Sequence, residues 1–216
     1  MVDFTLANAV RSGLLRLIVT TQYRPETLEA HLERRWVPLF PKAELLISDG
    51  AAVCGAGGYG GTADAVAANR TLIEAAASDA LLVLSGDHIY QIDYSALIAA
   101  HRALGAMVTL AVHRVPVDQA SAFGVVHRAP EGKITEFEEK PARPVADPGL
   151  PGQALVSMGV YVFDRAWLRC QLPKGRSQLD FGHDILPAAV AAGLAAADML
   201  PALQGQSDPY WRDVRT

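Results

Sequence analysis

The chain contains 216 residues, of which 50% are hydrophobic and 19% are charged, and its formal net charge is −4. This composition is ordinary for a soluble globular protein, and the acidic balance argues against a nucleic-acid partner or an anionic membrane surface. No apolar run approaches the ~20 residues that a membrane-spanning helix needs, and the two distant cysteines, Cys54 and Cys170, favour unpaired thiols in a cytoplasmic protein.

The first half of the chain alternates strand-like apolar runs with helix-like segments. The expected strands are residues 15–20, 43–47, 80–84 and 107–112, and the expected helices are residues 3–13, 25–35, 63–77 and one that Asp93 caps. A glycine-rich loop, residues 55–61, precedes the third of these helices. This alternation predicts an α/β fold with a Rossmann-like, doubly wound and mostly parallel sheet.

The pattern changes after His113, so we expect one domain made of two halves, residues 1–113 and 114–216. The second half should contain a hairpin of residues 124–127 and 133–138, a strand at 156–163 and a helix at 181–192 that Asp180 caps. It is therefore expected to be a mixed α+β half that packs against the same sheet.

Asp87 is the most informative single residue of the chain. The apolar run 80–84 ends at a small-residue turn, Ser85-Gly86, which delivers Asp87 past the end of the expected strand. The carboxyl ends of parallel strands are where open α/β sheets bind ligands. A carboxylate there is suited to Mg²⁺, which proteins hold with one or two carboxylates together with substrate phosphates. The alternative is a turn or helix-capping aspartate.

Several blocks stand in a fixed order along the chain: residues 59–65, 85–90, 120–125, 136–141, 157–163, 180–182 and 209–214. Among them are Ser85-Gly86-Asp87-His88-Ile89-Tyr90, Ala120-Ser121-Ala122-Phe123-Gly124-Val125 and Tyr210-Trp211-Arg212-Asp213-Val214. Together they resemble the bacterial and plant ADP-glucose pyrophosphorylases, also called glucose-1-phosphate adenylyltransferases. The resemblance implies that ATP and glucose 1-phosphate are the substrates and that ADP-glucose and pyrophosphate are the products. It also implies a nucleotide-binding first half and a sugar-phosphate-binding second half.

The resemblance implies catalytic roles for three residues. Asp87 and Asp213 correspond to the family's metal-binding aspartates, which hold Mg²⁺. Lys140 corresponds to the lysine that binds the phosphate of glucose 1-phosphate, as a compact point charge should. Without the family blocks, Asp213 would be a surface aspartate and Lys140 a solvated charge at a strand end.

Further substrate-binding roles follow from the same resemblance. Glu139 is expected to accept hydrogen bonds from glucose hydroxyls, and Ser157 is a candidate donor, with a hydrogen-bonded strand serine as the alternative. Gly124 is expected to let the backbone approach the sugar or base, with the start of a strand as the alternative. Tyr59 stands where the family has a tyrosine of the nucleotide and sugar site. Asp180 is a candidate sugar contact, with helix capping as the alternative. His88, beside Asp87, is interpreted as structural.

The chain departs from the family pattern at both ends. Family members have a glycine-rich, nucleotide-binding turn before the block that begins at Val2, and a left-handed β-helix after the catalytic domain. We therefore expect a single catalytic domain whose sheet lacks its first strand and which has no C-terminal β-helix. Three hypotheses stay open: an adenylyltransferase, an inactive homologue that binds sugar phosphate or partners a full-length subunit, and an enzyme that uses UTP or dTTP. Homo-oligomerisation is also left open.

Overall fold

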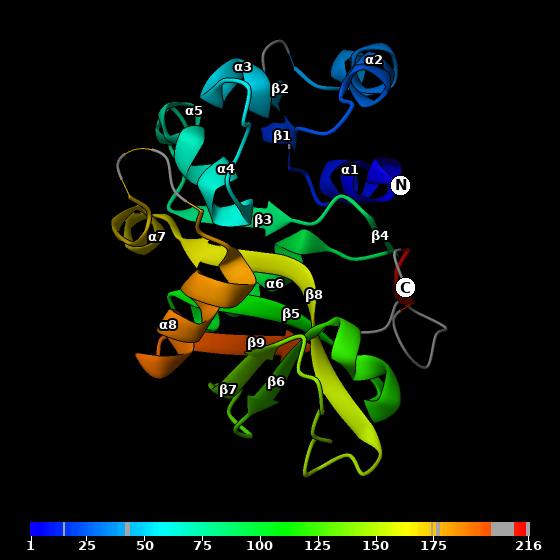
Figure 1. The fold of residues 1–216 in the computed structure, drawn as a ribbon, viewed down its shortest axis with the longest axis vertical. Coiled ribbons are helices and arrows are strands. Elements are labelled where there is room, and N and C mark those ends of the chain that lie inside the picture. Colours follow the sequence, from blue (N-terminus) through cyan, green and yellow to red (C-terminus); the bar gives the residue numbers. More distant parts are fainter. Residues whose placement is uncertain (15, 42–43, 174, 176–177, 200–209, 215–216) are drawn as a thin grey trace.

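A six-stranded mixed sheet lies at the centre of the protein (Figure 1). The structure is a computed structural model that describes residues 1–14, 16–41, 44–173, 175, 178–199 and 210–214. The strands of this sheet are β3 (Ala80–Leu84), β5 (Val108–Pro116), β6 (Gly124–Arg128), β7 (Ile134–Glu139), β8 (Gln153–Asp164) and β9 (Ala195–Met199). Their order is β7-β6-β8-β5-β9, and β3 pairs with the C-terminal part of β8.

Strand β8 gives the sheet its mixed character. It runs antiparallel to β3, β5 and β6, whereas β5 and β9 are parallel. Strands β3, β5 and β9 therefore point the same way, and β8 lies between β3 and β5 in the opposite direction. The α/β class is confirmed, but this sheet is mixed rather than mostly parallel. The apolar pattern of residues 156–163 predicts a buried strand and carries no information about its direction.

Two small sheets flank the central one. Strands β1 (Leu17–Thr21) and β2 (Leu45–Asp49) pair in parallel. Strands β4 (His88–Tyr90) and β10 (Trp211–Asp213) pair antiparallel, with Asp213 opposite His88. Residues 15 and 43, at the starts of two expected strands, lie outside the described residues.

The helices follow most of the expected positions. They are α1 (Val2–Arg11), α2 (Glu26–Arg35), α3 (Gly50–Cys54), α4 (Thr62–Ala68), α5 (Arg70–Glu74), α6 (Tyr94–Leu104), α7 (Arg165–Gln171) and α8 (Leu186–Ala191), with the shorter turns η1 (Val37–Leu39), η2 (Val117–Ala122) and η3 (Phe181–Ile185). The two expected caps are confirmed. Asp93 accepts the Ser95 amide, and Asp180 accepts the amides of Gly182 and His183.

Two helix expectations were wrong in detail. The expected helix at 63–77 is divided at Asn69, whose side chain accepts a hydrogen bond from Ser48 and donates one to the Ala65 carbonyl. Such a side chain competes with the helical ladder. Asp3 does not cap α1; it accepts a hydrogen bond from the Trp36 indole instead and so ties α1 to the end of α2.

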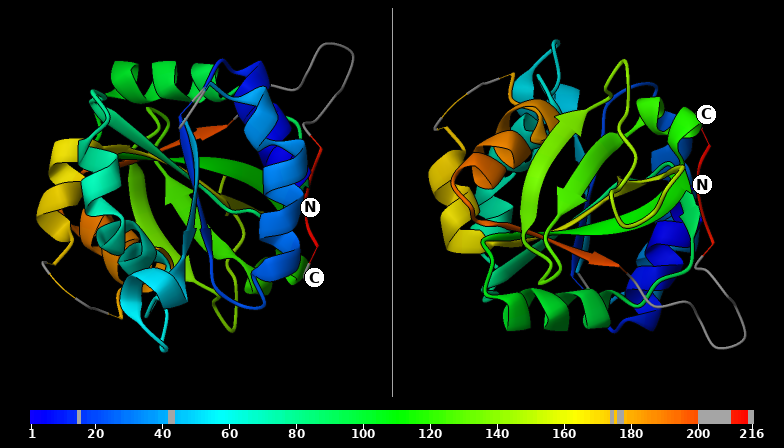
Figure 2. Two further views of the ribbon diagram at one scale, coloured as in Figure 1. Left: turned by 90° about the horizontal axis from the view of Figure 1, so that it is seen from above. Right: turned by 90° about the horizontal axis from the view of Figure 1, so that it is seen from below.

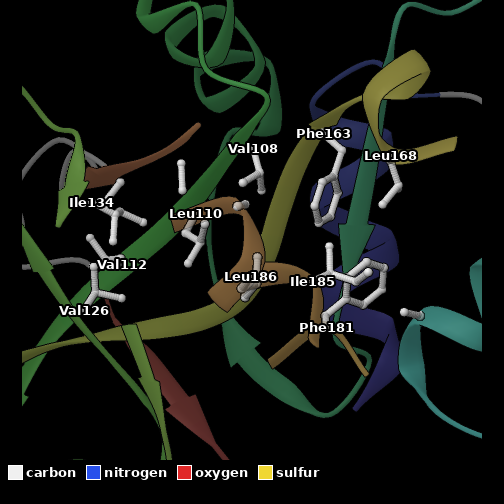
Figure 3. Close-up of a cluster of buried hydrophobic side chains, with 14 of the residues drawn as sticks. Val108, Leu110, Val112, Val126, Ile134, Phe163, Leu168, Phe181, Ile185 and Leu186 are labelled. Atoms are coloured by element: carbon white, nitrogen blue, oxygen red, sulfur yellow. The ribbon is translucent and has the colours of Figure 1, made fainter. Parts of the chain in front are cut away.

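The apolar core lies on both faces of the central sheet, because side chains alternate along each strand. On β5, Val108, Leu110 and Val112 belong to one buried cluster, while Ala111 and Val115 belong to the other. Helix α6 packs on the second cluster, and η3 with α8 packs on the first (Figures 2 and 3). In the part of the chain that the structure describes, no helix is both long and apolar enough to cross a bilayer.

A substitution at Phe163 tests whether this core is packed as described. Its side chain is fully buried, and its ring stacks on Trp167 at 6.3 Å and on Phe181 at 5.2 Å between centroids. Replacing Phe163 with alanine should lower the free energy of unfolding in urea by about 3–5 kcal/mol, because it leaves a cavity in the core. Tyr23→Ala is the control, since Tyr23 is 84% exposed. Equal effects of the two substitutions would contradict the described core.

Candidate functional site

The pairing of β4 with β10 brings two distant aspartates together. Asp87 lies between the end of β3 and the start of β4, and the Ser85 hydroxyl donates a hydrogen bond to its carboxylate. Asp213 stands directly opposite His88 in the antiparallel register. The sequence expectation that Asp87 and Asp213 approach each other at this edge is therefore confirmed.

His88 lies between the two carboxylates. Its Nε2 atom is 3.5 Å from Oδ1 of Asp87 and 3.7 Å from Oδ2 of Asp213. One ligand atom from each of the three residues lies within 4.8 Å of the others. His88 and Asp213 are buried, and Asp87 is half-buried. Two negative charges this close repel each other, so a cation between them is stabilising.

The hydrogen bonds of His88 orient its ring. Nδ1 lies 2.8 Å from the carbonyl oxygen of Met158 and 3.4 Å from the indole nitrogen of Trp211. These two contacts fix the ring so that Nε2 faces the carboxylates. Trp211 packs edge-on against the same ring at 5.4 Å. His88 thus has the structural contacts expected of it and also lies in the cluster with the two aspartates.

Glu139 occupies a niche made by two glycines. It pairs with Gly124 across the hairpin of β6 and β7. A Cβ atom on Gly124 would lie 2.9 Å from Oε2 of Glu139, and one on Gly182 would lie 2.6 Å from the same oxygen. Any larger residue at Gly124 or Gly182 would therefore displace the carboxylate. Gly124 makes room first for the Phe137 ring and then for Glu139, and a close approach of its backbone to the sugar or base remains a prediction.

Lys140 holds a strained backbone conformation at the end of β7. Its φ is +49°, in the left-handed region that residues other than glycine rarely adopt. Its amide donates a hydrogen bond to the carbonyl of Phe123, and its Nζ lies 3.5 Å from Oε1 of Glu139. Strain of this kind costs about 1–3 kcal/mol and is concentrated at functional sites. The structure thus brings Lys140 and Glu139 together, with the lysine side chain exposed.

Ser157 and Asp180 lie near Tyr161 of β8. The Ser157 hydroxyl donates a hydrogen bond to the Tyr161 hydroxyl at 3.2 Å. Burial raises the pKa of Tyr161 to about 12, and the nearby charges of Glu139 and Asp180 add to this rise against the Ser157 hydrogen bond. Tyr161 therefore belongs to the group, although sequence reasoning did not select it. Its place within a strand-like block offered no separate signal.

Asp180 has structural partners of its own. The Thr62 hydroxyl donates a hydrogen bond to its Oδ2 at 2.7 Å, and the amides of Gly182 and His183 donate to Oδ1. Burial acts to raise the pKa of Asp180, but these hydrogen bonds outweigh burial and lower it. The capping role is confirmed, while contact with a sugar remains a prediction.

Tyr59 joins a different polar cluster. Its hydroxyl donates to the Ser48 carbonyl at 3.0 Å and accepts a hydrogen bond from Asn69 at 3.2 Å, and its side chain is buried. Its amide donates to Gln22. Its phenol therefore serves the packing of β2 against α4, and a direct contact with substrate remains a prediction.

Strand β8 and Trp211 connect the acidic cluster to the Glu139 group. The carbonyl oxygen of Met158 contacts His88 in the acidic cluster. Of its two neighbours on β8, Gly159 lies against His88, whereas Ser157 bonds to Tyr161 near Glu139. Trp211 also packs on Phe123 at 5.1 Å, whose carbonyl holds the Lys140 amide. The two groups are therefore linked through β8 and through the packing of Trp211 on Phe123.

The raised pKa of Tyr161 predicts that the protein loses stability at alkaline pH. Because its pKa is raised above the ordinary value of about 10, the folded state favours the neutral phenol. The resulting stabilisation is complete below that ordinary value and is lost as the pH rises towards the folded-state pKa of about 12. In unfolding measurements across this interval, Tyr161→Phe should lose less stability than the unmodified protein.

Tyr23→Phe is the matched control, since Tyr23 is exposed. An alkaline loss of stability in Tyr161→Phe as steep as that of the unmodified protein would contradict the assignment.

The family model described as nucleotidyl transferase matches residues 1–216.

Proposed function

Because the chain belongs to the nucleotidyl transferase family, we propose that it transfers an adenylyl group from ATP to glucose 1-phosphate. A phosphate oxygen of glucose 1-phosphate attacks the α-phosphorus of ATP. A new P–O bond forms, the bond to the β-phosphate oxygen breaks, and ADP-glucose and pyrophosphate are the products. The observation that supports this proposal is the convergence of Asp87, His88 and Asp213, and the contact of Lys140 with Glu139 adds to it.

The acidic cluster fits a divalent cation. Asp87 and Asp213 provide the carboxylate oxygens that Mg²⁺ prefers, and the His88 nitrogen lies beside them. These residues would hold the ion. When bound, a divalent cation supplies positive charge for the phosphates that the reaction brings together.

The Glu139 group fits a sugar phosphate. Lys140 presents an exposed ammonium group, which suits a phosphate monoester as a point charge. Glu139, seated between the two glycines, is a fixed acceptor for sugar hydroxyls. Ser157, Tyr161 and Asp180 add further polar atoms around it. A rigid acceptor of this kind binds a sugar with little loss of side-chain entropy.

The choice of adenine rests on the sequence blocks that resemble ADP-glucose pyrophosphorylases. A panel of ATP, UTP, dTTP, CTP and GTP with glucose 1-phosphate and Mg²⁺, followed by pyrophosphate release, tests it. We expect turnover to be fastest with ATP. Preference for UTP or dTTP would reassign the base, and binding of glucose 1-phosphate without turnover would favour a sugar-phosphate-binding protein.

Lys140 provides the sharpest test of the sugar-phosphate assignment. Lys140→Ala should raise the KM for glucose 1-phosphate by about tenfold or more, while the KM for ATP changes by less than about threefold. The selective effect is expected because the lysine charge meets the sugar phosphate and not the nucleotide.

The matched control is Lys133→Ala, which removes an exposed lysine at the turn of the same hairpin. An equal rise of both KM values in Lys140→Ala would contradict the assignment.

A further inference from the structure

A cavity of about 330 Å³ lies between α4, α5, β3 and α7, away from the acidic cluster. Leu81 of β3 lines it, whereas Asp87 follows the opposite end of the same strand. Figure 1 shows α5 and α7 near the start of β3, and β4 beyond its other end. The cavity is therefore separate from the proposed catalytic site, and its volume is in the range of small-molecule pockets.

Three arginines give the cavity a positive wall. They are Arg70 of α5 and Arg165 and Arg169 of α7, and the one carboxylate among the lining residues is that of Glu74. Within the described residues, none of these arginines forms an ion pair with a carboxylate. The rest of the lining is apolar and consists of Val66, Ile73, Leu81, Ala166, Leu168 and Leu172. The cavity therefore combines positively charged side chains with an apolar lining.

Two of the guanidinium groups are held in place. Nη2 of Arg70 donates to the Leu172 carbonyl at 2.9 Å, at the end of α7. Nη1 of Arg165 donates to the Ala76 carbonyl at 2.6 Å, just past α5. The same two nitrogens also donate to the carbonyls of Arg169 and Ile73, at 3.4 Å and 3.5 Å. Each guanidinium therefore uses one terminal nitrogen for two carbonyls, and three of its five N–H donors remain. The bonds thus fix the two groups at the cavity wall and leave most of their donors for another acceptor.

Arg169 completes the set. It is exposed on α7, one helical turn after Arg165, so both side chains lie on the same helix face. Arginine suits planar or tetrahedral anions because its N–H groups form a fork that matches carboxylate and phosphate oxygens. From the cavity, its apolar floor and the three arginines, we propose that this pocket binds a small amphipathic anion, a phosphate or carboxylate carried on an apolar body.

Isothermal titration calorimetry with phenyl phosphate tests this proposal on the full chain. Phenyl phosphate should bind saturably, while inorganic phosphate, which lacks the ring, and benzyl alcohol, which lacks the charge, should bind at least about tenfold more weakly. The substitution Arg169→Gln should weaken phenyl phosphate binding by about tenfold or more. It should leave the fold intact, because Arg169 is exposed.

A second variant locates the ligand. Ala166→Trp places a large side chain at the cavity and should abolish binding while the arginines are retained. Arg34→Gln, which alters an exposed arginine of α2, is the control and should leave the affinity unchanged.

Three results would overturn the proposal: no binding of phenyl phosphate at about 10 mM, unchanged binding in both Arg169→Gln and Ala166→Trp, or loss of binding in Lys140→Ala alone. The last result would place the phosphate at the proposed sugar-phosphate site instead.

Discussion

The antiparallel pairing of β4 with β10 is the interaction on which the candidate site depends. It sets Asp213, near the end of the chain, opposite His88 and beside Asp87. Without this pairing, the two carboxylates would belong to unconnected segments. The cost of holding two negative groups together around a buried imidazole is offset where a cation joins them. Because the arrangement costs folding free energy, we expect it to serve function rather than stability.

Strand β8 extends the same constraint to the sugar-phosphate group. It lies in the middle of the central sheet, where it pairs with β3, β5 and β6. Its Met158 carbonyl orients His88, and its Ser157 and Tyr161 side chains lie near Glu139 and Asp180. A strand with partners on both edges is rigid, so the two halves of the site keep a fixed separation. The strained backbone of Lys140, fixed by its bond to Phe123, adds to this preorganisation.

Local patterns were enough to predict several parts of this arrangement. The apolar run before Asp87 indicated its place at a strand end, and single residues, Asp93 and Asp180, indicated the starts of helices. The resemblance to a known family, rather than any local pattern, selected Asp213 and Lys140. The place of His88 between the two carboxylates had no local signal, because its partners, the Met158 carbonyl and Asp213, come from distant strands. The direction of β8 and the helix break at Asn69 likewise depend on tertiary contacts, which periodicity does not encode.

Binding of Mn²⁺, followed by electron paramagnetic resonance, tests the central claim most directly, because it measures the acidic cluster without requiring turnover. The account predicts that the chain binds the ion at one site and that Asp213→Asn weakens binding by about tenfold or more. Asp118→Asn, at an exposed aspartate of η2, should leave binding unchanged. Equal Mn²⁺ affinity in the unmodified protein and in Asp213→Asn would contradict the account.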